Sequence, residues 1–440
     1  MTFSPDQLLE RLQALTAGDP CSRWIVAYSG GIDSTVLLHA LCTSGNELPV
    51  VAAHVDHGLH PQSADWAERC RRYAGSLGIE FRAFCVAVAD AGGGIEAAAR
   101  DARYRVLRSI VAAGDCLLSG HHEDDQAETL LLNLMRGSGP AGLAGIGAAQ
   151  PFGAGRLLRP MLGTGSAEIA AYAAEAGLDW IDDPANDETR FDRNYLRREI
   201  LPRLRSRWPA AARQLRRSAA LAGEASALLD DLADQDIAAC GRGHRLSITA
   251  LRCLPAPRQR NLLRRAVRQA GLPPIPAARI EQALHSLVTA REDAGPLVCW
   301  DGGEMRRYRD ELFVLAPAGQ PRAQAVMLFP GCRPQSLGPG LGEIALVDCE
   351  GAGIDRSLAA AGLALRFRAG GERIRIAGGG ATKTLKNLLQ ESGVLPWMRM
   401  RLPMLFAGDQ LVAVGDQWLS ADHLSTPGIA VEWHHRPEIR

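Results

Sequence analysis

The chain has 440 residues, which is too many for one ordinary hydrophobic core, so we expect two or three domains. Its 47% hydrophobic content is normal for a globular protein, and no uninterrupted apolar stretch is long enough to span a bilayer, which excludes an integral membrane protein. The formal net charge is zero, and the N-terminal MTFSPDQLLERLQ lacks the apolar region of a signal peptide. We therefore expect a cytoplasmic protein.

Alternating strand and helix patterns fill the chain up to about residue 185. We expect strands at 24–29, 50–57, 81–88 and 116–121, a weaker strand at 156–161, and helices at 34–42, 64–77, 95–112, 124–135 and 166–176. This rhythm is typical of an α/β domain with a parallel sheet covered on both faces. Ligands of such sheets bind at the carboxyl ends of the strands. The segments SGGIDS, HVDHG and SGHHEDDQAET follow three of these strands, so we expect them to converge on one crevice.

The SGGIDS loop lies between the first strand and the next helix. Its glycines let backbone N–H groups approach an anion, and the helix N-terminus and serine hydroxyls favour that anion further. It lacks the lysine with which a P-loop grips the γ-phosphate for transfer, which favours reaction at the α-phosphate of ATP instead. Asp33 could hold the magnesium that bridges the phosphates. The alternative is a structural glycine turn. We predict that the nucleotide is bound by Ser29, Gly30, Gly31, Ile32, Asp33 and Ser34.

This loop resembles that of the N-type ATP pyrophosphatases, or PP-loop enzymes. Members of this family cleave ATP between the α and β phosphates to adenylate a carbonyl oxygen, and a nucleophile then displaces AMP. The resemblance implies a PP-loop domain that uses ATP and magnesium.

An acidic segment opens the helix expected at 124–135. Asp124, Asp125 and Glu128 lie within about one turn, and the i,i+3 spacing puts Asp125 and Glu128 on one face. Read alone, the segment is an ordinary acidic helix N-terminus that complements the helix dipole. Close to SGGIDS it becomes a candidate site. On the helix expected at 95–112, Arg100 and Arg103 are also i,i+3 and can both point into the crevice.

The remainder of the chain changes in composition. We assign 1–210 to the catalytic domain, 211–318 to a mainly helical domain with a small strand pair, 319–340 to a Pro- and Gly-rich linker, and 341–440 to a small α+β module. The ten cysteines form no C-x-x-C pair and have no zinc-like spacing, so we interpret them mostly as small core residues.

Basic residues are unevenly distributed. Ten arginines against two acids lie in 190–217, and five arginines with no acid lie in 258–268. Such clusters indicate a nucleic-acid partner, although a solvated helix face is the alternative for either one alone. Lysine occurs only at Lys383 and Lys386, where a flexible point charge on a phosphate is the natural role.

Four further segments resemble the tRNA(Ile)-lysidine synthases, a PP-loop subfamily. They are GIEAAARDARY (94–104), GHHEDDQAETLLLNLMRGSGPAGLAGI (120–146), DDPANDETRFDRNYLRREILPRL (182–204) and TKTLKNLLQESGVLPWMRMRLPML (382–405), so the resemblance covers nearly the whole chain. These enzymes use ATP and free L-lysine to convert the wobble cytidine of a CAU-anticodon isoleucine tRNA into lysidine.

The resemblance implies roles for the candidate residues. Lysine must attack as a neutral amine although the pKa of its ε-ammonium is about 10.4, so the site must bind the ammonium and take a proton. Asp124, Asp125 and Glu128 would clamp it, and one acid or His122 would accept the proton. Arg100 and Arg103 would bind the lysine carboxylate or the α-phosphate. We expect the tRNA to contact Asn194, Arg197, Arg198, Lys383 and Lys386.

Two other functions stay open at this point. One is another PP-loop activity such as tRNA thiolation, whose enzymes usually carry C-x-x-C pairs. The other is a non-catalytic RNA-binding protein with a relic nucleotide site, although a relic has no reason to keep both SGGIDS and DDQAET. The sequence does not determine the oligomeric state, and a homodimer is one of the alternatives.

Overall fold

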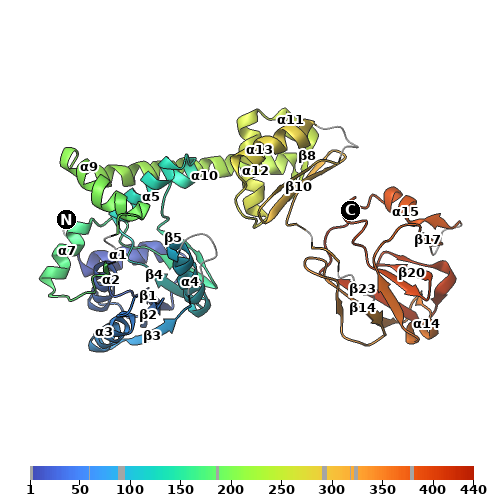
Figure 1. Cartoon of the computed structure of the whole chain (residues 1–440), viewed down its shortest axis with the longest axis horizontal. Coiled ribbons are helices and arrows are strands. Elements are labelled where there is room, and N and C mark those ends of the chain that lie inside the picture. Colours follow the sequence, from blue (N-terminus) through green and yellow to red (C-terminus); the bar gives the residue numbers. More distant parts are fainter. Residues whose placement is uncertain are drawn as a thin grey trace. The chain divides into compact units, whose positions relative to one another are not determined.

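The computed structural model describes residues 3–58, 60–87, 95–184, 188–289, 295–317, 319–321, 326–376 and 381–440. The chain divides into two compact units, Met1–Leu228 and Leu229–Arg440. Figure 1 shows the first unit as helices around a central sheet and the second as two smaller strand-containing modules. No helix in the described ranges is long and apolar enough to cross a membrane.

A six-stranded sheet forms the centre of the first unit. Its strand order is β3-β2-β1-β4-β6-β5, with all neighbours parallel except the antiparallel edge strand β5. The strands are β1 (Arg23–Ala27), β2 (Val50–Asp56), β3 (Glu80–Cys85), β4 (Asp115–Leu118), β5 (Ala149–Phe152) and β6 (Gly155–Leu158). The parallel α/β fold predicted from the sequence is confirmed, and only the edge strand β5 was not expected.

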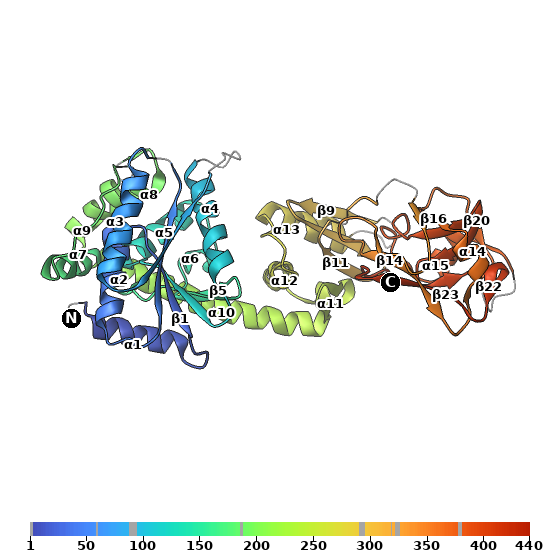
Figure 2. The same cartoon turned by 90° about the horizontal axis from the view of Figure 1, so that it is seen from below.

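Helices cover both faces of this sheet, as Figure 2 shows. They are α1 (Pro5–Thr16), α2 (Ile32–Thr43), α3 (Ser63–Ser76), α4 (Ile95–Ile110), α5 (Glu123–Met135), α6 (Pro140–Leu143) and α7 (Ser166–Glu175). Successive strand residues face opposite sides. Trp24 and Val26 of β1 therefore join the core made with α1, α2, α3 and α7, whereas Ile25 joins the core made with α4.

The two central strands set the position of the crevice. The connections from β1 lead outward to β2 and β3 on one side, whereas β4 and β6 lie on the other. Strand order therefore reverses between β1 and β4, and ligands of open parallel sheets bind at such a switch point, beyond the carboxyl ends of the strands. The SGGIDS loop leaves β1 at this edge, and the acidic helix α5 follows β4.

Three short helical segments follow the sheet before one long helix. They are α8 (Asp192–Tyr195), a π-helical turn (Leu196–Ile200) and α9 (Leu201–Arg207), and the long helix is α10 (Ala211–Cys240). Ala212 of α10 and Leu201 of α9 pack on Ala127 of α5. This packing holds the arginine-rich segment against the helix that carries the candidate acids.

The first module of the second unit contains more strand than its sequence suggested. Helices α11 (Ile248–Cys253), α12 (Ala256–Gln269) and α13 (Ala277–Ala283) accompany a five-stranded sheet in the order β7-β8-β11-β10-β9. The strands are Gly241–Arg242, Arg245–Ser247, Glu311–Leu315, Gly303–Tyr308 and Leu297–Trp300 in that order. Only the β9–β10–β11 region was expected as strand, because β7 and β8 are too short to show a period-two pattern.

The C-terminal module has two antiparallel five-stranded sheets, β12-β16-β19-β20-β21 and β13-β14-β23-β15-β22. The shorter strands are β15 (Gly353–Ile354), β19 (Met404–Ala407), β20 (Gln410–Val414), β21 (Trp418–Leu419) and β22 (Leu424–Ser425). Its longest strands are β14 (Glu343–Cys349) and β23 (Gly428–His434), and its helices are α14 (Arg356–Ala360) and α15 (Leu385–Glu391). Strands β12 (Val326–Leu328) and β13 (Gln335–Ser336) fall within 319–340, which we expected to be a linker. They pair with β16 (Leu363–Arg366) and β14, so this segment forms part of the module instead.

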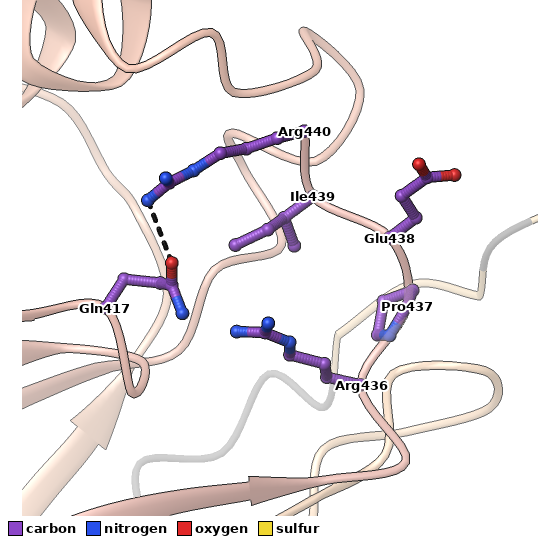
Figure 3. Close-up of a pocket in the computed structure, with 6 residues that line it drawn as sticks. All are labelled: Gln417, Arg436, Pro437, Glu438, Ile439 and Arg440. Atoms are coloured by element: carbon purple, nitrogen blue, oxygen red, sulfur yellow. Dashed lines mark hydrogen bonds between the residues drawn. The ribbon is translucent and has the colours of Figure 1, made fainter.

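An open pocket lies at the end of this module. Figure 3 shows its lining, with the Arg440 guanidinium donating a 2.8 Å hydrogen bond to the side-chain oxygen of Gln417. Arg436 lies beside it and forms an ion pair with Asp416 at 2.8 Å. None of the site residues predicted from the sequence lines this pocket.

Candidate active site

The loop after β1 has the backbone geometry of an anion cradle. Gly30 has a φ of +86°, in the left-handed region that favours glycine, and an added Cβ would lie 2.6 Å from Ile181 and 2.7 Å from Cys70. Gly31 is the N-cap of α2, and no side chain caps the helix there. The first N–H groups of α2 are therefore available to an anion, as expected for SGGIDS.

Side-chain hydroxyls hold this loop in shape. The Ser34 hydroxyl accepts a 3.2 Å hydrogen bond from the Ser29 amide and donates at 3.0 Å to the Gly31 carbonyl. The hydroxyls of Ser29 and Ser34 lie 3.1 Å apart, and Thr35 donates to the Gly30 carbonyl at 3.2 Å. Ser34 and Thr35 are buried, so the loop is formed before any ligand arrives.

The loop after β4 meets this cradle through Gly120. A Cβ at Gly120 would lie 3.1 Å from the backbone carbonyl of Asp33, so the two loops touch backbone to backbone. Two residues later, His122 caps α5: its Nδ1 accepts a 3.2 Å hydrogen bond from the Asp124 amide. Because Nδ1 accepts, the proton of a neutral His122 is on Nε2. This nitrogen lies 3.6 Å from a carboxylate oxygen of Asp33 and 3.6 Å from one of Asp125.

The two carboxyls beside His122 differ in proton affinity. Burial raises the pKa of Asp33, and the nearby Asp125 carboxylate adds to this effect. Burial also tends to raise the pKa of Asp125, but His122 and Arg193 outweigh it, and this pKa lies below its usual value. The pair therefore places a more basic carboxylate and a firmly ionised one on either side of one imidazole.

Arginines from the segment after the sheet pair with the acids of α5. Arg193 donates at 2.7 Å to Glu128 and at 3.0 Å to Asp125, and Arg197 donates at 2.6 Å and 3.0 Å to the same two side chains. Arg205 forms an ion pair with Asp124. Glu128 is completely buried, so these partners offset the cost of its charge.

This arrangement differs from two expectations. Asp125 and Glu128, which we expected to clamp the ammonium of a substrate, also have guanidinium partners from the same chain. Arg197, expected on the RNA side, lies instead among the acids because its side chain reaches back to α5. Asn194 donates to the Glu188 carbonyl at 3.1 Å, and Arg198 is exposed.

Basic and aromatic groups gather on the α4 side of the crevice. Arg103 donates to His57 Nε2 at 3.1 Å, and the Arg100 guanidinium lies 5.4 Å from the ring centroid of Tyr104. Burial, followed by Arg103, lowers the pKa of His57 to about 4, so this imidazole is neutral near pH 7. Sequence reasoning identified Arg100 and Arg103 but missed His57.

Other participants were also missed. Arg193 and Arg205 stand in the arginine-rich segment that we assigned to RNA alone. The spacing of Arg193 and Arg197 was a usable signal, because an i,i+4 pair of arginines can match the i,i+3 pair Asp125 and Glu128.

The predicted residues of the second unit are not part of this cluster. Lys383 forms a 2.6 Å ion pair with Glu391, and Lys386 is exposed at the start of α15. In the cluster 258–268, Arg258, Arg260, Arg265 and Arg268 form ion pairs with Asp236, Glu281, Asp234 and Asp230 respectively. These four arginines therefore join elements of the module, whereas we expected them to grip phosphates.

The site fits a nucleotide–magnesium complex. Asp33 offers a partly exposed carboxylate at the uncapped N-terminus of α2, beside the amides that would bind phosphate. Among the described residues no group of three or more His, Cys, Asp or Glu side chains could hold a metal ion by itself. Magnesium usually binds through one or two carboxylates plus phosphate oxygens, so Asp33 is the residue that would hold it.

Comparisons with known proteins identify the family of the chain. Three family models match the chain: the PP-loop domain over residues 5–204, the TilS substrate binding domain over 246–313 and the TilS substrate C-terminal domain over 363–433. The chain is similar to curated tRNA(Ile)-lysidine synthases along nearly its whole length. The relative from Alkalilimnicola ehrlichii is 42% identical, covering 97% of this chain and 96% of that protein.

Two further relatives have the same name. The protein of Xanthomonas campestris is 41% identical over 92% of this chain and 93% of its own, and that of Methylococcus capsulatus is 40% identical over 96% and 99%. The resemblance seen in the sequence motifs is thereby confirmed, together with an ATP-using PP-loop domain. The chain belongs to the tRNA(Ile)-lysidine synthase family.

Proposed function

We propose that the protein joins free L-lysine to carbon 2 of the wobble cytidine in a CAU-anticodon isoleucine tRNA. ATP adenylates the oxygen on that carbon and releases pyrophosphate, and the ε-amine of lysine then displaces AMP to give lysidine. The observation that carries this proposal is the contact between the two loops, which brings the anion cradle of α2 to the acids of α5. We expect this reaction in the cytoplasm, where tRNA and ATP meet.

The cradle supports chemistry at the α-phosphate. The amides of Gly31 to Ser34 and the hydroxyls of Ser29 and Ser34 can bind the β,γ-pyrophosphate as a unit, with Asp33 as a ligand to magnesium. When bound, magnesium would neutralise charge on the phosphates. Holding the pyrophosphate makes it the leaving group, and the α-phosphorus is left open to the cytidine oxygen.

The acidic cluster supports capture of one ammonium group. Asp124, Asp125 and Glu128 of α5 are paired with three guanidinium groups, those of Arg193, Arg197 and Arg205. Asp33, whose carboxylate lies 3.6 Å from the His122 imidazole, is reserved for magnesium. A lysine ammonium would bind at the acids of α5, while the arginines keep these buried acids ionised and in place.

Proton removal is the next requirement, because only a neutral amine attacks. We propose that His122 or one acid of α5 accepts the proton, since the imidazole lies 3.6 Å from both Asp33 and Asp125. Arg100 and Arg103 supply positive charge on the opposite side, for the lysine carboxylate or the α-phosphate.

The tRNA would approach along α9 and the start of α10. Arg203, Arg207, Arg213 and Arg217 are exposed there, and Trp208 between the two helices is 60% exposed. Exposed arginines with an exposed aromatic side chain suit a single-stranded RNA loop. We propose that Asn194 and Arg198 bind near the reactive base, and that the two modules of the second unit, including Lys383 and Lys386, bind other parts of the tRNA.

The test is incorporation of labelled lysine into two transcripts, a CAU-anticodon isoleucine tRNA and a methionine tRNA with the same anticodon. We expect label in the first alone, with AMP and pyrophosphate formed in equal amounts and a requirement for magnesium. An Asp33→Asn variant should form neither product. Pyrophosphate release without any lysine incorporation would exclude lysine as the nucleophile and redirect the search to other amines.

A further inference from the structure

Arg159 is a buried cation without an acidic partner. It follows β6 at the carboxyl edge of the sheet and is only 5% exposed. Its Nη1 donates a 2.7 Å hydrogen bond to the Gly147 carbonyl, and Tyr104 contacts the guanidinium through its hydroxyl. Nε is fully enclosed and has no hydrogen-bond partner. Within the described residues, no carboxylate lies within ion-pair distance of it.

A charge buried in this way has a cost. An isolated ion loses its hydration when it enters the protein interior, so buried arginines are normally paired with acids. Burial and the nearby Arg100 lower the pKa of Arg159, but a guanidinium stays protonated in proteins. The structure therefore keeps a positive charge at the crevice without a negative group to balance it.

The surroundings define which ligand would balance that charge. Arg159 occupies the α4 face of the sheet with Tyr104 and Arg100, whereas the carboxylate cluster lies around α5. His121 is close enough to both groups to be influenced by Asp125 and Arg193 and also by Arg159 and Arg100. Burial lowers the pKa of His121 to about 4, so this imidazole adds no charge near neutral pH. The crevice thus has a negative and a positive end.

We propose that Arg159 binds an oxyanion of a substrate in this crevice, either the carboxylate of the incoming amino acid or the α-phosphate of ATP. The inference rests on the proposed function and extends it to a residue that no sequence motif had selected. A free amino acid such as lysine suits the polarity of the site, because its ammonium fits the carboxylate cluster and its carboxylate fits the unpaired guanidinium of Arg159. A guanidinium provides two parallel donors for this purpose.

The experiment compares two amines that differ only in the carboxylate. Lysine and 1,5-diaminopentane are supplied in turn to the full-length wild type, Arg159→Met and Arg159→Lys, with ATP and the isoleucine tRNA transcript. Arg156→Met is the matched control, since Arg156 lies on β6, three residues before Arg159, but pairs with Asp19 and the Leu15 carbonyl. Melting temperatures of all variants, with and without each amine, separate a loss of fold from a loss of ligand.

The two sources of the oxyanion predict different results. If Arg159 holds the carboxylate, Arg159→Met should lose about 10- to 100-fold in kcat/KM for lysine and nothing for diaminopentane. The stabilisation of the protein by added lysine should disappear as well, and Arg159→Lys should recover only part of both. If Arg159 holds the α-phosphate, Arg159→Met should lower kcat/KM for both amines and the rate of pyrophosphate release together, and it should raise KM for ATP.

The proposal is overturned if Arg159→Met changes none of these constants, or if Arg156→Met has the same effect. A wild type that ligates neither amine would instead contradict the proposed function. In that case the affinities for lysine and for ATP are measured by calorimetry in the wild type and in Arg159→Met. Unchanged affinities in the variant would exclude Arg159 as a ligand-binding residue.

Discussion

The arginine-rich segments 190–217 and 258–268 have a similar composition but different surroundings. In 258–268, four of the five arginines pair with acids of α10 or α13. The opposite face of α12 packs Leu262, Leu263, Ala266 and Val267 into the core. In 190–217, Arg193, Arg197 and Arg205 pair with acids of the active site, while Arg207, Arg213 and Arg217 are exposed.

The difference shows that an excess of arginine in a segment does not indicate which groups neutralise those arginines. Three of the acids that neutralise 258–268 stand more than twenty residues earlier, on α10, and the fourth, Glu281, stands later, on α13, so only the fold brings them together. We propose that the first segment serves two purposes, in which its inner arginines support catalysis and its outer arginines bind RNA. Four predictions test this distinction.

The largest effect should follow from an inner arginine. Arg197→Met leaves Glu128 with Arg193 alone and shifts the acids that receive the ammonium, so we expect lysine incorporation to fall by about 100-fold. Breaking part of a buried ion network should also destabilise the first unit by about 1–3 kcal/mol, less than for a fully buried pair because Arg197 is 40% exposed. Steady-state kinetics and chemical denaturation measure the two effects. Arg260→Met, in the other segment, should change neither constant, and an equal loss there would contradict the comparison.

The outer arginines should determine how RNA binding depends on salt. Replacing Arg207, Arg213 and Arg217 by alanine removes up to three phosphate contacts, so the slope of log Kd against log salt should decrease by about 2–3. We expect tRNA affinity to weaken by about tenfold or more at physiological salt. The matched triple variant at Arg260, Arg265 and Arg268 should leave the slope unchanged. If the second triple variant flattens the slope instead, the assignment of the two segments is reversed.

Substitutions in the segment 258–268 should affect stability and not RNA binding. Arg258→Leu leaves Asp236, which is 2% exposed, without its guanidinium partner, so the melting temperature of the second unit should fall. The double variant Arg258→Leu/Asp236→Leu should recover much of this loss, because no buried charge is left unpaired. Lysine incorporation by the single variant, measured well below its melting temperature, should match the wild type.

The smallest expected effect is a difference between the two units in how their stability depends on pH. Burial lowers the pKa of His57 and of His121 to about 4, so the unfolded chain binds protons at these residues before the folded one does. Their contribution to the stability of the first unit is complete above about pH 6.5 and declines as the pH falls to about 4. In the second unit Arg265 lowers the pKa of Asp234, so its contribution is lost only below the usual aspartate range.

Hydrogen exchange, followed separately for peptides of α5 and α12, measures this order. Protection of α5 should weaken first as the solution is acidified from pH 6.5. A His57→Gln/His121→Gln variant should flatten that dependence, and simultaneous loss of protection in both helices would contradict it.

How much could be predicted from the sequence depended on how local the signal was. SGGIDS and DDQAET follow buried strands, so the rule for ligand sites of parallel sheets was sufficient to place them at one edge. The partners of Asp125 and Glu128 could not be predicted by this rule, because Arg193 and Arg197 stand some seventy residues away in the sequence. Arg159 gave no signal at all, since its burial and its lack of an acid are properties of the folded chain.

The C-terminal module shows the same limit. Its longer strands were visible as apolar runs, but β12 and β13 lie in a Pro- and Gly-rich stretch that reads as a linker. They become strands because β16 and β14 offer unpaired backbone edges. Pairing partners remote in sequence decide such assignments.

The backbone contact at Gly120 has a mechanical consequence. With only 3.1 Å between a Cβ placed there and the Asp33 carbonyl, neither loop can move toward the other without displacing it. A nucleotide that binds at the first turn of α2 and shifts Asp33 would therefore displace Gly120, two residues before the N-cap His122, and with it the acids at the start of α5. Nucleotide binding and amine binding would then be coupled. The acids of α5 would reach the positions that bind the amine only when the nucleotide is bound.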